Sequence, residues 1–221
     1  MKTRSKLITG LGSLALIGAA TATGLTATTA TASGSNDHGR HLHAHLDPLN
    51  NSGATGRSVV KFHGHKANVD INARGLAKGL PHAQHIHFGA DARHECPSVY
   101  DDTNNDHRLN VAEGLPAYGD IVASLTKTGP TDPGSALAVD RFPTTPRGVE
   151  HYNRDINFAD AAVRKAIKRG KGVVVIHGVD YNGNGKYDMR GAGPSELDPT
   201  LPAEATDPAL CGVLRVHRHH H

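Results

Sequence analysis

The residues best suited to chemistry are two histidines, His85 and His87, separated by one apolar residue. In an extended strand, residues i and i+2 point to the same face, so both imidazoles can bind one transition-metal ion. Ile86 then points to the opposite face, toward a hydrophobic interior. The alternative interpretation is a pair of surface histidines on an exposed strand.

The N-terminal segment 1–32 has the features of a secretory signal peptide. Basic residues precede an apolar run over 7–20, and a stretch of small residues ends in Ala30-Thr31-Ala32, which is typical of a cleavage site. The apolar run is short for a membrane span, and no cysteine follows it that could carry a lipid. We therefore expect a secreted, soluble protein without a membrane or lipid anchor.

The charge of the chain changes when this segment is removed. The full sequence has 24 Lys plus Arg and 21 Asp plus Glu, and Lys2, Arg4 and Lys6 lie in the signal peptide, so the mature chain is formally neutral. It has no basic stripe interleaved with aromatic residues, which disfavours nucleic acid and anionic membranes as partners. The motifs of nucleotide binding, serine hydrolysis, thiol redox chemistry and zinc proteases are also missing.

The chain has two cysteines, Cys96 and Cys211. In an exported protein, two cysteines far apart in sequence favour a disulfide, which closes a long loop. Two free thiols or a thiolate metal site are the alternatives.

Two histidine-rich segments flank the region that we expect to fold. The segment 33–57 is rich in Gly, Ser, Asn and His without hydrophobic periodicity, and we predict a flexible arm. The tail 217–221 is also rich in histidine. Imidazoles on such segments can capture copper or zinc loosely, and merely solvated segments are the alternative.

The remaining region, 58–216, is predicted to be one all-β domain. Its short β-branched segments are separated by Gly, Pro and Asp turns, a pattern that favours a sandwich or barrel. One short helix is predicted between Asp160 as its cap and Gly170 as its stop. The predicted strands are 58–62, 66–73, the segment around His85 and His87, 120–126, 136–141, 172–177 and 211–216.

Several motifs occur in the order found in Cu/Zn superoxide dismutases. The first half of the family pattern is resembled by Gly75-Leu76-x-x-Gly79-Leu80, His85-Ile86-His87, Gly89-x-Asp91, Cys96 and Tyr118-Gly119-Asp120-Ile121. The second half is resembled by Val173-Val174-Val175-Ile176-His177 and Cys211-Gly212-Val213-Leu214. The resemblance covers 75–214, and its most specific part is the joint occurrence of H-x-H, the late histidine and both cysteines.

The resemblance implies a Greek-key β-barrel of the Cu/Zn superoxide dismutase type with long metal-binding loops. It also implies copper bound by His85, His87 and His177, and a disulfide between Cys96 and Cys211. The implied function is a secreted metal-binding protein that dismutates the small anion superoxide by one-electron cycling of copper. The alternatives are a non-catalytic, calcium-stabilised extracellular module like the CHRD domains, and a periplasmic or extracellular copper-storage protein.

Three features depart from the family pattern and indicate a divergent or copper-only branch. The zinc histidines have no counterparts before Asp120, so we expect no zinc site. A fourth copper histidine is not found at the family's spacing, and His94 and His107 are the candidates. Pro208 stands where the family has an arginine that attracts superoxide.

Two loops, 102–113 and 180–191, have the donor spacing of calcium-binding loops. In the first, His107 replaces the glycine at position 6, which usually needs a positive φ. In the second, Gly191 replaces the final glutamate, so another carboxylate such as Glu196, or water molecules, would have to complete the site. Asn/Asp-rich surface turns are the alternative for both loops. The predicted ligands are Asp102, Asn104, Asp106, Asn110, Glu113 and the Arg108 carbonyl, and then Asp180, Asn182, Asn184, Asp188 and the Lys186 carbonyl.

Overall fold

The computed structural model describes residues 40–216. The predicted signal peptide, the first part of the predicted arm including His38, and the tail 217–221 lie outside these residues. Within 40–216, no helix is both long and apolar enough to cross a membrane.

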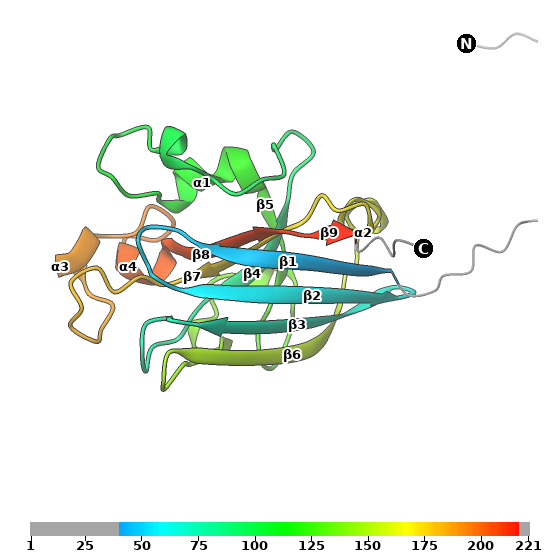
Figure 1. Cartoon of the computed structure of the whole chain (residues 1–221), viewed down its shortest axis with the longest axis horizontal. Coiled ribbons are helices and arrows are strands. Elements are labelled where there is room, and N and C mark those ends of the chain that lie inside the picture. Colours follow the sequence, from blue (N-terminus) through cyan, green and yellow to red (C-terminus); the bar gives the residue numbers. More distant parts are fainter. Residues whose placement is uncertain (1–39, 217–221) are drawn as a thin grey trace, which may run out of the picture. The chain divides into compact units, whose positions relative to one another are not determined.

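The described chain forms one antiparallel sheet that curls into a nearly closed barrel (Figure 1). The strand order is β5-β4-β7-β8-β1-β2-β3-β6, and β9 pairs with β1. The strands are β1 (His41–Pro48), β2 (Thr55–His63), β3 (Lys66–Arg74), β4 (Gln84–Phe88), β5 (Asp120–Ser124), β6 (Val149–Asn157), β7 (Val173–His177), β8 (Pro208–Val213) and β9 (Arg215–Val216). The all-β barrel predicted from the sequence is therefore confirmed.

The gap between the two end strands, β5 and β6, is bridged by side chains. The Tyr152 hydroxyl donates to the Thr126 carbonyl at 3.2 Å, and the Arg154 guanidinium donates to the same carbonyl at 2.6 Å. The barrel interior is filled mainly by Val, Ile, Leu, Ala and Phe side chains from all of the longer strands. Burial of this apolar surface is the main force that holds the sheet curled.

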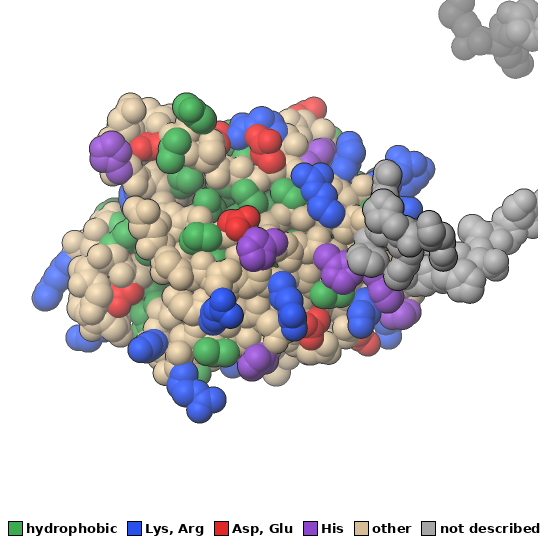
Figure 2. Space-filling view, viewed as in Figure 1, with side chains coloured by type: hydrophobic (Ala, Val, Ile, Leu, Met, Phe, Trp, Pro, Cys, Tyr) green, Lys and Arg blue, Asp and Glu red, His purple; other side chains and the backbone are tan. Residues whose placement is uncertain are grey.

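The predicted flexible arm is wrong for 41–57, which forms β1 and the start of β2. Along β1, Leu42, Ala44 and Leu46 are buried in the barrel, whereas the alternating histidines are exposed. This is the period-2 pattern of a half-buried strand, with histidine as the polar half. Figure 2 shows histidine and basic side chains on the outer face that β1 shares with its neighbours.

Two further predictions about strands are corrected by the structure. The segment 136–141 is not a strand; it contains the 3-10 turn η3 (Val139–Arg141), which follows η2 (Pro133–Ser135). Conversely, β6 was not predicted, because polar residues such as Glu150 occupy inward positions and hide its alternation. The other predicted strands are confirmed within a few residues, although the last one divides into β8 and β9.

The predicted helix is confirmed as α2 (Ala161–Lys168), and the Asp160 carboxylate caps it by accepting from the Ala162 and Val163 amides. The prediction of a single helix is incomplete, because short helices also occur in the loops. They are η1 (Val99–Asp101), α1 (Val111–Tyr118), α3 (Met189–Ala192) and α4 (Ala203–Thr206).

The disulfide between Cys96 and Cys211 is confirmed. It ties the loop that follows β4 to β8, where Cys211 lies opposite Val175 of β7. The long loop that carries α1 is therefore anchored to the wall of the barrel.

Glu150 is the most unusual residue of the interior. It is buried on the inner side of β6, and both of its carboxylate oxygens lack a hydrogen-bond partner. Burial raises its pKa to about 8, and the neighbouring Gln84 amide offsets this only in part. The Glu150 side chain is therefore mainly protonated below about pH 8.

Replacing Glu150 with glutamine should reduce the loss of stability at alkaline pH. The pKa of Glu150 is higher in the folded protein than in the unfolded chain, so protonation of Glu150 favours the folded state. This contribution to stability is complete below about pH 4.5 and is lost as the pH rises through about 8. Thermal melting should show Glu150→Gln more stable than wild type by about 5 °C or more on the alkaline side, with the difference shrinking in acid. Equal pH profiles for wild type, Glu150→Gln and the exposed control Glu95→Gln would contradict this assignment.

Candidate metal centre

The pairing of β4 with β7 brings the three predicted copper histidines together. His85 lies opposite Val175, and the His177 amide donates to the Ala83 carbonyl at 2.7 Å. Cross-strand partners share a face, so His177 projects on the same outer face of the barrel wall as His85 and His87. Irregularities of register, between Ile86 and His87 and between Ile176 and His177, redirect the chain at two of these positions.

The three rings form a compact, buried cluster. One nitrogen from each of His85, His87 and His177 lies within 4.8 Å of the other two, and the side chains are only 3%, 1% and 3% exposed. In the described part of the chain, no other group of three or more His, Cys, Asp or Glu residues comes together in this way. The surface-histidine interpretation is therefore wrong for this pair.

Hydrogen bonds to backbone carbonyls fix which nitrogen of each ring carries a proton. His85 Nε2 lies 3.1 Å from the Ala136 carbonyl, His87 Nδ1 lies 2.9 Å from the Gly119 carbonyl, and His177 Nδ1 lies 2.5 Å from the Thr206 carbonyl. A carbonyl oxygen can only accept, so each of these nitrogens is the donor. The opposite nitrogens, His85 Nδ1, His87 Nε2 and His177 Nε2, carry the lone pairs and have no partner.

Burial also keeps the three rings neutral. It is the largest cause that lowers the pKa of His85 well below its usual value, that of His87 to about 3 and that of His177 to about 4. Mutual repulsion between the imidazolium forms adds to the effect at His85 and His87. At neutral pH the cluster therefore offers unprotonated imidazole nitrogens within 4.8 Å of one another, a ligand set that suits a transition metal.

Two aromatic residues that were not predicted hold the rings in place. Phe142 packs edge-on against His85 with ring centroids 5.4 Å apart, and Tyr118 lies 4.4 Å from the His87 ring. Tyr118 belongs to the Tyr-Gly-Asp-Ile segment noted in the sequence, but Phe142 had no local signal. Its role depends on the fold of the loop between β5 and β6.

Neither candidate for a fourth nitrogen ligand joins the cluster. The His94 ring stacks on Phe88 with centroids 5.3 Å apart. His107 lies in the first predicted calcium loop, where its φ of 63° provides the turn that glycine usually makes. In the described residues the cluster therefore consists of three histidines.

The first predicted calcium loop is folded around its own donor side chains. The Asp102 carboxylate accepts from the amides of Asp106 and His107, and the Asn104 and Asp106 side chains accept from amides two residues further on. The Glu113 carboxylate receives the amides of Thr103, at loop position 2, and Asn110, at position 9.

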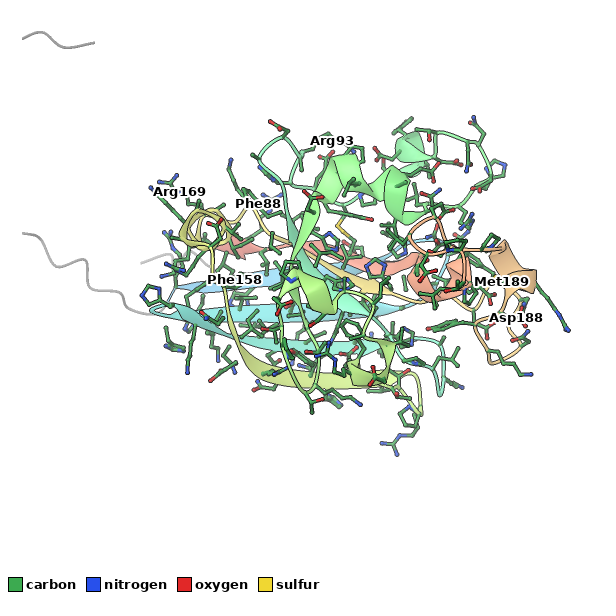
Figure 3. The ribbon with its side chains drawn as sticks, turned by 180° about the vertical axis from the view of Figure 1, so that it is seen from behind. Phe88, Arg93, Phe158, Arg169, Asp188 and Met189 are labelled. Carbon is green, nitrogen blue, oxygen red and sulfur yellow. A yellow bond between two sulfur atoms is a disulfide. The ribbon has the colours of Figure 1, made fainter. Side chains whose placement is uncertain are left out.

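The second predicted loop has the same pattern, with a glutamate supplied from outside it. The Asp180 carboxylate accepts from the amides of Asn184 and Gly185, and Gly185 has a φ of 79°. The Glu204 carboxylate receives the amides of Tyr181, at position 2, and Asp188, at position 9. Figure 3 shows this loop at one end of the barrel, with Asp188 and Met189 labelled.

Glu204 thus takes the place that Glu113 has in the first loop. A side chain at Gly191, which is position 12, would collide with the Glu204 carboxylate. The suggested donor Glu196 instead pairs with Arg108 at 3.3 Å. Sequence reasoning missed Glu204 because it lies in α4, outside the loop.

Comparisons with known proteins do not assign the chain to a family. No protein-family model matches it, and no curated protein matches it either. The function therefore has to be argued from the geometry of the site.

The cluster predicts a large loss of metal affinity when one histidine is removed. His177→Ala should lower the affinity for Cu²⁺ by about 100-fold or more, since loss of an outer-shell partner alone costs 10- to 100-fold. Competition titration against a copper chelator measures this difference. His94→Ala is the matched control and should bind as wild type does, because its ring lies outside the cluster.

Histidines elsewhere in the chain give a background of weak sites, which both variants retain. If wild type and His177→Ala bound their first and tightest copper ion with equal affinity, this result would contradict a metal site at the cluster.

Proposed function

We propose that the protein is a secreted copper protein of the Cu/Zn superoxide dismutase type, with copper held by His85, His87 and His177. The observation that carries the proposal is the convergence of three buried imidazole nitrogens that have lone pairs and no partner. Leaving such groups unpaired in the interior costs free energy, and a bound metal ion would recover it.

The choice of copper rests on the resemblance and on the ligands. Three neutral imidazoles suit both copper and zinc, but Cu²⁺ binds more tightly than Zn²⁺ in a given nitrogen site. The zinc histidines of the family have no counterparts in this chain. We therefore propose one copper ion and no second metal beside it.

The strand order supports the Greek-key type of barrel. β4 and β5 are neighbours, β6 follows across the bridged gap, and β7 returns to lie on the other side of β4. This is the arrangement of three consecutive strands with the fourth beside the first. The return of β7 is also the step that carries His177 to the other two histidines.

Bound copper would supply one-electron chemistry, in which one superoxide is oxidised to dioxygen and a second, with two protons, is reduced to hydrogen peroxide. The protein's own residues contribute the rest. The carbonyls of Ala136, Gly119 and Thr206 hold the rings in one orientation, and burial keeps the metal-free rings neutral. Such a preorganised ligand set does not have to rearrange when the metal changes its charge.

A second candidate function is copper binding without turnover, as in a storage protein or a CHRD-like module. The observation that favours it is that no fourth histidine of the described residues joins these three as a possible ligand. Both candidates share the copper site, so they differ only in reactivity.

Electron paramagnetic resonance and superoxide turnover test the site and separate the two functions. Wild type loaded with one equivalent of Cu²⁺ should give a spectrum with nitrogen couplings and should consume superoxide. The double variant His85→Ala, His177→Ala should lose both signals down to the background from other histidines. Equal spectra in the two proteins would remove the copper site, whereas a histidine-dependent spectrum without turnover would establish the binding function.

We also propose that calcium stabilises the loops 102–113 and 180–191. The support is that both loops share one pattern of turns and that Glu113 and Glu204 bridge positions 2 and 9 in the same way. Oxygen donors at this spacing suit calcium.

Chelation of calcium from copper-free protein should lower the melting temperature, and added calcium should restore it. A ligand at 100 times its Kd stabilises the folded state by about 2.7 kcal/mol. Glu204→Gln should reduce the shift that calcium produces, whereas Glu196→Gln, which alters the pair with Arg108, should retain it. A melting temperature that does not respond to calcium would refute the proposal.

A further inference from the structure

We propose that the basic side of α2 is a binding surface for an acidic polysaccharide. This inference goes beyond the proposed copper site, because none of the three histidines belongs to the surface. Figure 3 labels Arg169 beside α2, at the opposite end of the barrel from Asp188 in the second predicted calcium loop.

Positive charge is concentrated in α2 and just after it. The segment 161–178 contains five basic residues and no acidic one. The nearest acid in the sequence is Asp160, whose carboxylate is already engaged by the amides of Ala162 and Val163. A short run so rich in lysine and arginine is typical of sites that bind polyanions.

The helix separates its apolar residues from its basic ones. Ile167 is buried, and Val163 packs against the core of the barrel. Residues four apart lie on the same side of a helix, so these two side chains anchor α2 to the barrel. The opposite side carries the basic residues Arg164, Lys165, Lys168 and Arg169.

The fold adds a fifth cation from a distant part of the chain. Arg40 lies directly before β1, and its Nη1 donates to the Lys168 carbonyl at 3.1 Å. Arg40 and the four basic residues of the helix line a hollow of about 280 Å³, and Ala161 is the remaining lining residue. This end of α2 therefore presents a concave surface with five cations and no acidic group in its lining.

Most of these cations are available to a ligand. Four of the five, all but Lys168, form no ion pair with any described residue. The Arg164 guanidinium donates to the Phe158 carbonyl at 2.9 Å, but a guanidinium has five N–H donors, so most of them remain. Like charges held close together repel one another, and a bound polyanion would relieve this repulsion.

Further cations extend the surface over the neighbouring strands. Lys61 lies opposite His41, and Arg215 lies opposite His43, all on the outer face of the sheet. Figure 2 shows basic and histidine side chains spread over this face. The acidic residues that β3 and β6 place on it are hydrogen-bonded to asparagines, and Asp47 lies at the far end of β1. A long polymer can therefore contact more cations than a small anion can.

The chemistry of the surface favours a polysaccharide over a membrane or a nucleic acid. Among the described residues, none of the exposed large apolar side chains belongs to α2 or β1. The surface thus has no apolar group to enter a bilayer and no aromatic ring to stack on bases. Guanidinium and ammonium groups do bind sulfate and carboxylate groups, which an acidic polysaccharide carries along a polar chain.

Titration of the full chain with fluorescent polymers tests the proposal. Dextran sulfate and polygalacturonate supply the two kinds of oxyanion, and dextran is the uncharged control. At pH 8 imidazoles are largely neutral, so binding reports mainly on lysine and arginine. The variant Lys165→Gln, Arg169→Gln removes two exposed charges from the hollow. The matched control Lys78→Gln, Arg147→Gln removes the same charge beyond the other ends of β3 and β6.

Wild type should bind at least one of the acidic polymers and should not bind dextran. The affinity should fall as salt is added, because the cations of the hollow are largely exposed to solvent. The variant Lys165→Gln, Arg169→Gln should bind about 10-fold more weakly or worse at low salt. The control Lys78→Gln, Arg147→Gln should stay within about 2-fold of wild type, since distant surface charges contribute little.

Three results would overturn the proposal: no binding of either acidic polymer at low salt, equal binding of dextran, or equal losses of affinity in the two double variants. Competition tests the class of partner. Displacement of the bound polysaccharide by duplex DNA or by anionic lipid vesicles, at a lower concentration of anionic charge, would assign the surface to that other class and refute the proposal.

Discussion

The register between β4 and β7 is the constraint on which the rest of the site depends. His177 is far from His85 and His87 in the sequence, and only antiparallel pairing of these two strands brings its ring to the same outer face. Because side chains alternate along a strand, a shift of one residue would turn His177 into the barrel interior. Ile86, Val174 and Ile176 fill that interior, so the hydrophobic core enforces the register that assembles the cluster.

Loops from three parts of the chain then orient the rings. Ala136 lies between β5 and β6, Gly119 ends α1, and Thr206 ends α4, and each offers its carbonyl to one histidine. The disulfide ties the loop before α1 to β8, and a partly buried ion pair of 2.7 Å between Arg108 and Asp207 connects that loop to the segment next to Thr206. The irregular parts of the structure are thus the parts that define the direction of each lone pair.

The sequence predicted the elements whose signal is local. The alternation of Lys66–Arg74, the run of valines before His177 and the cap at Asp160 were each readable within a few residues. β1 was missed because histidine served as its polar half, and β6 because Glu150 faces inward. Phe142 and Glu204 could not be predicted, because each acts on a residue that the fold alone brings near. The disulfide was predicted because two cysteines leave only one pairing.

The central claim is that three neutral imidazole rings are held with their lone pairs facing one another before any metal binds. Nitrogen-15 NMR of histidine side chains in the metal-free protein tests it directly, because the two neutral tautomers and the cation give different shifts. We expect the Nε2–H tautomer for His85 and the Nδ1–H tautomer for His87 and His177 at neutral pH. The opposite tautomer or a protonated ring at any of the three positions would contradict the account.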